Sequence, residues 1–193
     1  MIKIYENRNQ MLLDLPKNLI VAELGVFNGT FSESILKICE PSQLILIDLW
    51  ENANIMSGDV DGNNVVKLNG EDLYNQVNTK FQNVENIVIH RDYTTSALSK
   101  YPDDYFDVVY IDADHSYSGC MADLEISFKK VKSGGYIMGH DYEQNFEKTK
   151  NVYNFGVNRA VNEFCQKYSQ TISIKANDGC VSYGIKIKKN NIK

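Results

Sequence analysis

The sequence lacks the features of several common protein classes. Its 193 residues include four cysteines, Cys39, Cys120, Cys165 and Cys180, but no Cys-x-x-Cys pair. A structural zinc site or a disulfide framework is therefore not expected. No apolar run approaches the roughly 20 residues needed to cross a bilayer, and the polar start of the chain does not resemble a signal peptide. We expect a cytoplasmic protein with reduced cysteines and no membrane span.

The sequence also lacks the basic excess typical of proteins that bind nucleic acids. Lysine and arginine together number 20 against 25 aspartates and glutamates, which gives a formal net charge of -5. This balance argues against a nucleic-acid partner. Internal repeats and low-complexity tracts are absent as well. The length and the 43% hydrophobic content suit a single domain over residues 1–193 with a sizeable core.

Apolar runs alternate with helix-length segments, which predicts an α/β fold with a doubly wound sheet. The middle runs are almost continuously apolar, as expected for strands buried on both faces of a parallel sheet. Asn177-Asp178-Gly179 predicts a hairpin, and therefore an antiparallel pair at the C-terminal end of a mostly parallel sheet. The seven predicted strands are 19–23, 43–48, 87–90, 106–112, 135–139, 171–176 and 181–187, and the predicted helices are 30–39, 71–81, 116–131 and 157–168.

Two long polar stretches, 51–70 and 142–156, interrupt this alternation. The second carries four aromatic residues, Tyr142, Phe146, Tyr153 and Phe155. Loops of this length in a compact domain are usually functional or disordered. We interpret both as active-site loops, with plain surface insertions as the alternative, and residues 1–18 as an N-terminal segment before the first strand.

A glycine-containing turn, Glu23-Leu24-Gly25-Val26-Phe27-Asn28-Gly29, joins the first predicted strand to the first predicted helix. This arrangement binds nucleotide-like cofactors at the carboxyl end of a parallel sheet. The Gly-x-x-x-Gly spacing differs from the Gly-x-Gly-x-x-Gly of a pyrophosphate site, and a carboxylate at Glu23 would repel phosphate. The pattern favours S-adenosylmethionine over NAD, with a tight connection that binds nothing as the alternative.

Three more cofactor-binding candidates follow predicted strands. Asp48 is suited to accept hydrogen bonds from ribose hydroxyls, or else it ends the strand as a cap. Trp50, the only tryptophan, either covers an adenine face or packs beside the sheet. Asp92 either receives the adenine amino group or forms a turn.

Aspartates and histidines follow the fourth and fifth predicted strands, as Asp112 and His115 and as His140 and Asp141. If these strands are neighbours, about 5 Å apart, two carboxylates converge at one sheet edge. A divalent cation such as Mg²⁺, Mn²⁺ or Ca²⁺ would relieve their repulsion. A histidine there is a natural general base. The alternative is that these residues only cap the helix that begins near Ser116.

Four segments resemble the class I S-adenosylmethionine-dependent methyltransferases. They are 21–29, 46–48, 110–117 and 134–142; the first two are generic for that superfamily, and the last two are more specific. The chain looks most like the small group that includes metal-dependent O-methyltransferases of sugars and natural products. The resemblance covers about residues 19–188. It implies a Rossmann-like sheet of seven strands, the last inserted antiparallel, and methyl transfer from a sulfonium to an acceptor.

The resemblance also implies roles for the aspartates and histidines. Asp112 and Asp141 would be metal ligands, and His115 would be the base. His140 departs from the Asp or Glu usual at its position, so it would be a third ligand, a group that orients a ligand, or the base instead of His115. A nitrogen ligand would favour Mn²⁺ over Mg²⁺.

The function expected from the resemblance is S-adenosylmethionine-dependent O-methylation, assisted by Mg²⁺ or Mn²⁺, of a small-molecule or glycan acceptor such as a sugar. The alternatives are an NAD-dependent oxidoreductase and a non-catalytic cofactor-binding module. The acidic charge and the lack of an Asn-Pro-Pro-Tyr-like motif make a nucleic-acid or protein acceptor less attractive. Since no substrate domain is added to the fold, acceptor recognition could fall to the two loops, the N-terminal segment or a second copy in a homo-oligomer.

Overall fold

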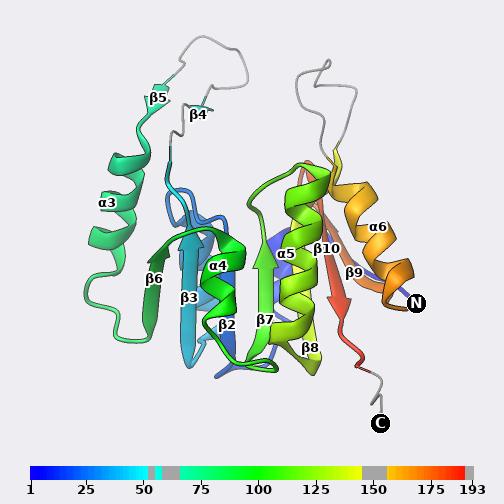
Figure 1. Cartoon of the computed structure of the whole chain (residues 1–193). Coiled ribbons are helices and arrows are strands. Elements are labelled where there is room, and N and C mark those ends of the chain that lie inside the picture. Colours follow the sequence, from blue (N-terminus) through cyan, green and yellow to red (C-terminus); the bar gives the residue numbers. More distant parts are fainter. Residues whose placement is uncertain (52–54, 58–65, 145–155, 190–193) are drawn as a thin grey trace.

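A single eight-stranded sheet with helices on both faces forms the centre of the molecule (Figure 1). The computed structural model describes residues 1–51, 55–57, 66–144 and 156–189. The sheet runs in the order β1-β9-β10-β8-β7-β2-β3-β6. Its strands are β1 (Lys3–Tyr5), β2 (Ile20–Leu24), β3 (Gln43–Asp48), β6 (Ile87–Arg91), β7 (Phe106–Ile111), β8 (Val131–Gln144), β9 (Ile172–Asn177) and β10 (Cys180–Lys186).

The strand directions confirm the predicted Rossmann-like α/β fold. Strands β6, β3, β2, β7 and β8 run parallel, and β10 is antiparallel to both of its neighbours, β8 and β9. The predicted count of seven strands is wrong, because β1 adds an eighth strand parallel to β9, with Lys3 opposite Ile174. Three residues are too few to show the alternation of apolar and polar side chains that predicts a strand. Strand β1 is recognised only by its backbone pairing with β9.

In the described part of the chain, six helices flank the sheet, and each buries apolar side chains on the sheet side. Helices α1, α2 and α3 pack against one face of the sheet, and α4, α5 and α6 pack against the other. The described helices are α1 (Arg8–Leu12), α2 (Thr30–Cys39), α3 (Gly70–Phe81), α4 (Thr94–Ser99), α5 (Tyr117–Lys130) and α6 (Val157–Lys167). Four of them agree with the predicted helices to within about a residue. Helices α1 and α4 were not predicted, because five and six residues span less than two helical turns.

The two predicted loops are only partly described. Strands β4 (Ile55–Ser57) and β5 (Val66–Leu68) form a separate antiparallel pair within 51–70. Tyr142 belongs to β8 and is buried. The aromatic residues Phe146, Tyr153 and Phe155 lie outside the described residues, so a role for these loops over a ligand stays a prediction. No helix in the described ranges is both long enough and apolar enough to cross a membrane.

Candidate active site

The glycine turn after β2 packs directly against the end of β7. Gly25 has a φ of +85°, and a Cβ atom there would lie 1.9 Å from the carbonyl oxygen of Asp112. The backbone N–H of Asp112 donates to Leu24 O at 2.7 Å, and that of Gly25 donates to Ile47 O at 2.9 Å. Glycine is therefore required by the protein's own backbone, and this contact brings the turn beside Asp112.

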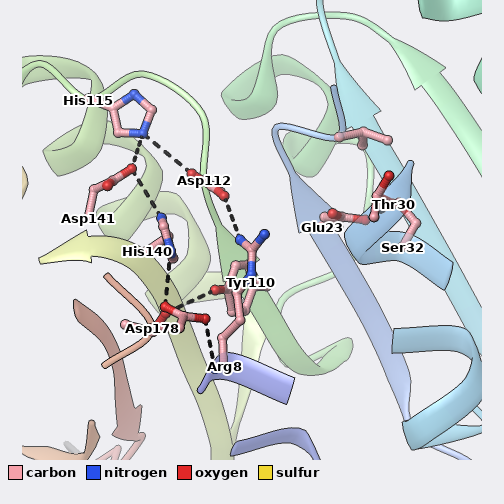
Figure 2. A network of polar contacts seen from close by, with 12 residues as sticks. Arg8, Glu23, Thr30, Ser32, Tyr110, Asp112, His115, His140, Asp141 and Asp178 are labelled. Carbon is pink, nitrogen blue, oxygen red and sulfur yellow. Dashed lines mark hydrogen bonds and ion pairs between the residues drawn. The ribbon is translucent and has the colours of Figure 1, made fainter. Parts of the chain in front are cut away.

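Glu23 lies beneath this turn, on the side of helix α2. Its side chain is buried and accepts a hydrogen bond from the Ser32 hydroxyl (Figure 2). Burial raises the pKa of Glu23 to about 8. The carboxyl group is therefore mostly protonated at neutral pH, so it does not supply the negative charge on which the sequence argument relied.

Asp48 holds the turn to the end of β3 through three backbone N–H groups. One carboxylate oxygen accepts from Val26 at 2.7 Å and from Phe27 at 2.9 Å, and the other accepts from Trp50 at 2.9 Å. The Trp50 ring is buried, donates its indole N–H to Phe27 O at 2.8 Å and packs 5.2 Å from the Tyr74 ring. In this structure Trp50 is therefore a packed residue rather than an exposed stacking face.

Asp92 occupies the turn between β6 and α4. Its backbone N–H donates to Asp48 O at 3.2 Å, which joins the ends of β6 and β3. Its carboxylate accepts from the Tyr93 N–H at 2.8 Å and pairs with Lys100 at 2.7 Å. These contacts are those of a turn-forming aspartate, and they leave Asp92 next to Asp48 at the same sheet edge.

Asp112, His115 and Asp141 converge just past Ile111 and Gly139, the last paired residues of β7 and β8, and we call them the Asp/His cluster (Figure 2). His115 Nε2 lies 2.7 Å from Asp141 Oδ2 and 3.4 Å from Asp112 Oδ1. His140 lies behind the cluster, with Nδ1 3.2 Å from the same Asp141 oxygen. The predicted convergence of the two strand ends is thus present, and His115 contacts both carboxylates.

The three side chains perturb one another strongly. Burial lowers the pKa of His115, but its hydrogen bonds to the Asp112 and Asp141 carboxylates outweigh burial and raise the pKa to about 9. Burial raises the pKa of Asp141, yet its contacts with His115 and His140 hold that pKa well below the usual range. Asp141 also has a φ of 56°, a strained conformation of the kind that concentrates at functional sites.

Two charged residues that were not predicted complete the site. Arg8 of α1 places Nη1 3.2 Å from Asp112 Oδ2. Asp178, in the turn between β9 and β10, accepts the Arg8 backbone N–H at 3.2 Å, and its Oδ1 lies 3.8 Å from His140 Nε2. Arg8 and Asp112 are 104 residues apart, and Arg8 precedes the region of family resemblance. No local signal in the sequence marks it.

The donor set of the Asp/His cluster suits a divalent cation. Two carboxylates and one imidazole each offer a ligand atom, and these atoms all lie within 4.8 Å of one another. Oxygen ligands with one nitrogen are compatible with Mg²⁺ and more favourable for Mn²⁺. The predicted third ligand, His140, does not belong to this group, whereas His115 does.

The fold is shared with solved methyltransferases of low sequence identity. The N-methyltransferase NodS from Bradyrhizobium japonicum, in complex with S-adenosyl-L-homocysteine, gives a TM-score of 0.64 at 12% identity, over 94% of this chain and 86% of that chain. Fibrillarin from Aeropyrum pernix, with natively bound S-adenosyl-L-methionine, gives 0.61 at 12% identity, over 92% and 72%. Precorrin-6y C5,15-methyltransferase from Geobacter metallireducens gives 0.61 at 13% identity, over 94% and 85%.

Sequence comparison gives a family. No curated protein matches the sequence. The family model described as a methyltransferase domain matches residues 22–142, which include the glycine turn and the Asp/His cluster. Because this match covers more than half of the 193 residues, the chain belongs to the methyltransferase domain family and is an S-adenosylmethionine-dependent methyltransferase.

Proposed function

We propose that the protein transfers a methyl group to a hydroxyl of a small acceptor such as a sugar or glycoconjugate, with help from Mg²⁺ or Mn²⁺. The observation that carries this proposal is the contact between the glycine turn and the strand end that bears Asp112. A methyl donor bound at the turn would lie beside the Asp/His cluster. We also propose that residues 1–193 form one methyltransferase domain, because β1 and α1 join the same sheet and core.

In this proposal Asp112 and Asp141 hold the cation and His115 is the base. Methyl transfer from a sulfonium requires an aligned acceptor and a group that takes its proton. With Nε2–H donating to Asp141, the basic nitrogen of His115 is Nδ1, and the acceptor proton moves to that atom. The contact with Asp141 fixes the orientation of the imidazole ring. A cation held by Asp112 and Asp141 would orient the acceptor hydroxyl and lower its pKa.

The cation also matters for the protonation state of His115. The hydrogen bonds that His115 donates to Asp112 and Asp141 raise its pKa to about 9, so the imidazole is mostly charged at neutral pH. A cation held by these carboxylates would weaken their preference for the imidazolium, and the pKa of His115 would fall toward its ordinary value. His115 would then be available as a base near neutral pH.

For the cofactor we propose a site at the glycine turn, with Gly25, Gly29, Asp48 and Asp92 beside the ligand, while the buried Glu23 and Trp50 support the turn. Backbone amides occupy three of the roughly four acceptor sites of the Asp48 carboxylate. One site remains for a ribose hydroxyl. This assignment gives Asp48 two tasks, since it fixes the turn and also contacts the ligand.

A test is mass spectrometry of candidate hydroxylated acceptors incubated with S-adenosylmethionine and Mn²⁺. We expect the mass gain of one methyl group, its loss with EDTA or Asp112→Ala, and a rate at least about 100-fold lower for His115→Gln. His90→Gln is the matched control, because His90 pairs with Tyr101 and lies outside the cluster. Activity that survives both EDTA and Asp112→Ala would exclude the metal-assisted mechanism.

A second assignment exchanges the roles of the two histidines. The 4.8 Å grouping favours His115 as a third ligand, which would leave His140 as the base. Mn²⁺ affinity separates the two. If His115 is only the base, His115→Gln retains Mn²⁺ binding, and if His115 is a ligand, the same change weakens Mn²⁺ binding at least about tenfold.

A further inference from the structure

Among the described lysines and arginines, only Arg8 forms an ion pair with a residue of the Asp/His cluster. It belongs to α1, in the N-terminal segment, and its guanidinium Nη1 lies 3.2 Å from Asp112 Oδ2. The other Asp112 oxygen, Oδ1, faces His115 at 3.4 Å. Both oxygens of this carboxylate therefore already have a partner inside the protein (Figure 2).

The Arg8 charge is held in place by further contacts. Its guanidinium lies over the Phe31 ring, 4.4 Å from the centroid, and its backbone N–H donates to Asp178 at 3.2 Å. The side chain is 30% exposed, so part of it is shielded from water. Since an arginine side chain does not lose its proton in proteins, a fixed positive charge lies against Asp112 at every working pH.

We propose that Arg8 is a built-in counter-ion of the cation site, and that it competes with a divalent cation for Asp112. This inference rests on the proposed metal site and adds its regulation by the N-terminal segment. A dication that approaches Asp112 meets the repulsion of Arg8 at a distance of a few ångströms. Arg8 and the cation both interact with the Asp112 carboxylate, and such coupling is reciprocal. A bound cation therefore also weakens the ion pair between Asp112 and Arg8 of α1.

Arg8 has a second, opposing effect, because it also orients the Asp112 carboxylate. Without Arg8, cation binding has to order the Asp112 side chain, which costs only the conformational entropy of one short side chain. The repulsion acts between a unit charge and a double charge across a partly desolvated gap, where the effective dielectric constant is well below that of water. Repulsion is therefore the larger effect, and removal of Arg8 is expected to tighten cation binding at least about tenfold.

The experiment measures Mn²⁺ binding by the electron paramagnetic resonance signal of free Mn²⁺, on the full chain without cofactor or acceptor. Arg8→Gln removes the charge, and Arg8→Lys retains it without the planar fork. Arg91→Gln is the matched control, because Arg91 also combines an ion pair, at 2.7 Å to Glu71, with a ring contact, 4.8 Å from the Tyr74 centroid. Strand β6 lies three positions from β7, roughly 14 Å away, which exceeds the screening length of about 8 Å.

The proposal expects Mn²⁺ affinity at least about tenfold higher for Arg8→Gln, a smaller gain for Arg8→Lys, and wild-type affinity for Arg91→Gln. Equal or weaker binding by Arg8→Gln overturns the counter-ion role and leaves the metal site standing. Absence of Mn²⁺ binding in every variant overturns both. Circular dichroism confirms that each variant is folded.

Discussion

At the scale of single residues, the backbone of Asp112 at the end of β7 leaves no room for a side chain at position 25 of the glycine turn. Gly25 and Gly134 have nearly the same left-handed backbone, with φ of +85° and +90°, but only Gly25 faces backbone atoms where a Cβ would be. We expect Gly134→Ala to lower the free energy of unfolding by about 1–2 kcal/mol, the cost of a left-handed alanine. Gly25→Ala should lower it by at least about 3 kcal/mol, because the clash with Asp112 adds to that strain. Urea unfolding measures both, and equal losses would contradict the clash.

Asp123 is a buried carboxyl whose charge costs stability. It lies on α5, accepts a hydrogen bond from Thr94 Oγ1 at 2.5 Å, and burial raises its pKa to about 6. The protonated carboxyl of Asp123 is favoured by folding, because its pKa is higher in the folded state than the value near 3.9 in the unfolded chain. Its contribution to the free energy of unfolding is therefore complete below about pH 3.9 and is lost as the pH rises through about 6. Asp123→Asn keeps an acceptor for Thr94 and cannot ionise. The variant should therefore gain up to about 3 kcal/mol over the wild type above pH 6 and nothing below pH 4.

Urea unfolding at a series of pH values measures this difference. The stability curve of Asp123→Asn should lie flatter than that of the wild type between pH 4 and pH 6 and stay parallel to it above pH 7. Parallel curves over the whole range would mean that Asp123 ionises freely in the folded protein.

The chemistry-bearing residues of the Asp/His cluster could be predicted at this scale, but their partners could not. Asp112 and Asp141 each follow an apolar run, and parallel neighbours end at the same edge of a sheet. Arg8 and Asp178 reach the same place from the N-terminal segment and from a hairpin turn. Their arrival depends on how β1 and β9 dock at the far edge of the sheet, which no local pattern encodes. The sequence argument for a metal started from the repulsion between the two carboxylates, and the ion pair of Arg8 with Asp112 changes that premise.

At the scale of secondary-structure elements, two aspartates lock strands to their neighbours at opposite ends of the sheet. Asp48, at the carboxyl edge, accepts three backbone N–H groups, and Asp107, at the amino edge, accepts the Ile20 N–H at 2.8 Å and pairs with Lys132 at 2.7 Å. Asp48→Asn turns one acceptor oxygen into a donor that faces other donors. It should destabilise the protein by about 1–3 kcal/mol and weaken S-adenosylhomocysteine binding at least about tenfold.

Asp107→Asn is the control for this change. It loses comparable contacts at the edge that carries no part of the proposed cofactor site, so stability should fall while ligand affinity stays at the wild-type value. Calorimetric titration of both variants with S-adenosylhomocysteine separates the two effects. Equal affinities for Asp48→Asn and Asp107→Asn would remove Asp48 from the proposed cofactor site.

Elements with a full period of apolar residues were predictable, and shorter ones were not. The bounds of β3 and α2 agree with the prediction, because six and ten residues display their patterns completely. The three residues of β1 and the five of α1 do not. Strand β8 begins before the predicted 135–139 and continues beyond it to Gln144, since antiparallel pairing with β10 extends it past the polar residues His140 and Asp141. Pairing with a distant strand, rather than local hydrophobicity, determines this length.

At the scale of the whole molecule, the fold gathers segments from along the entire sequence at the carboxyl edge of one sheet. The glycine turn, the ends of β3 and β7, the end of β8, helix α1 and the hairpin turn all contribute. Any ligand that binds this edge therefore contacts several elements that unfold together. Such a ligand should stabilise the whole domain, and the size of that effect distinguishes between candidate cofactors.

Thermal unfolding with candidate ligands tests the cofactor at this scale. S-adenosylhomocysteine at 100 times its dissociation constant should add about 2.7 kcal/mol of stability, which for a chain of this size raises the melting temperature by about 5–10 °C. NAD at the same concentration should leave it unchanged, because the Gly25-x-x-x-Gly29 turn lacks the spacing that cradles a pyrophosphate. Asp48→Asn should reduce the S-adenosylhomocysteine shift, and Asp107→Asn should retain it. A shift with NAD and none with S-adenosylhomocysteine would overturn the cofactor assignment, since a ligand that binds only the folded state must raise its melting temperature.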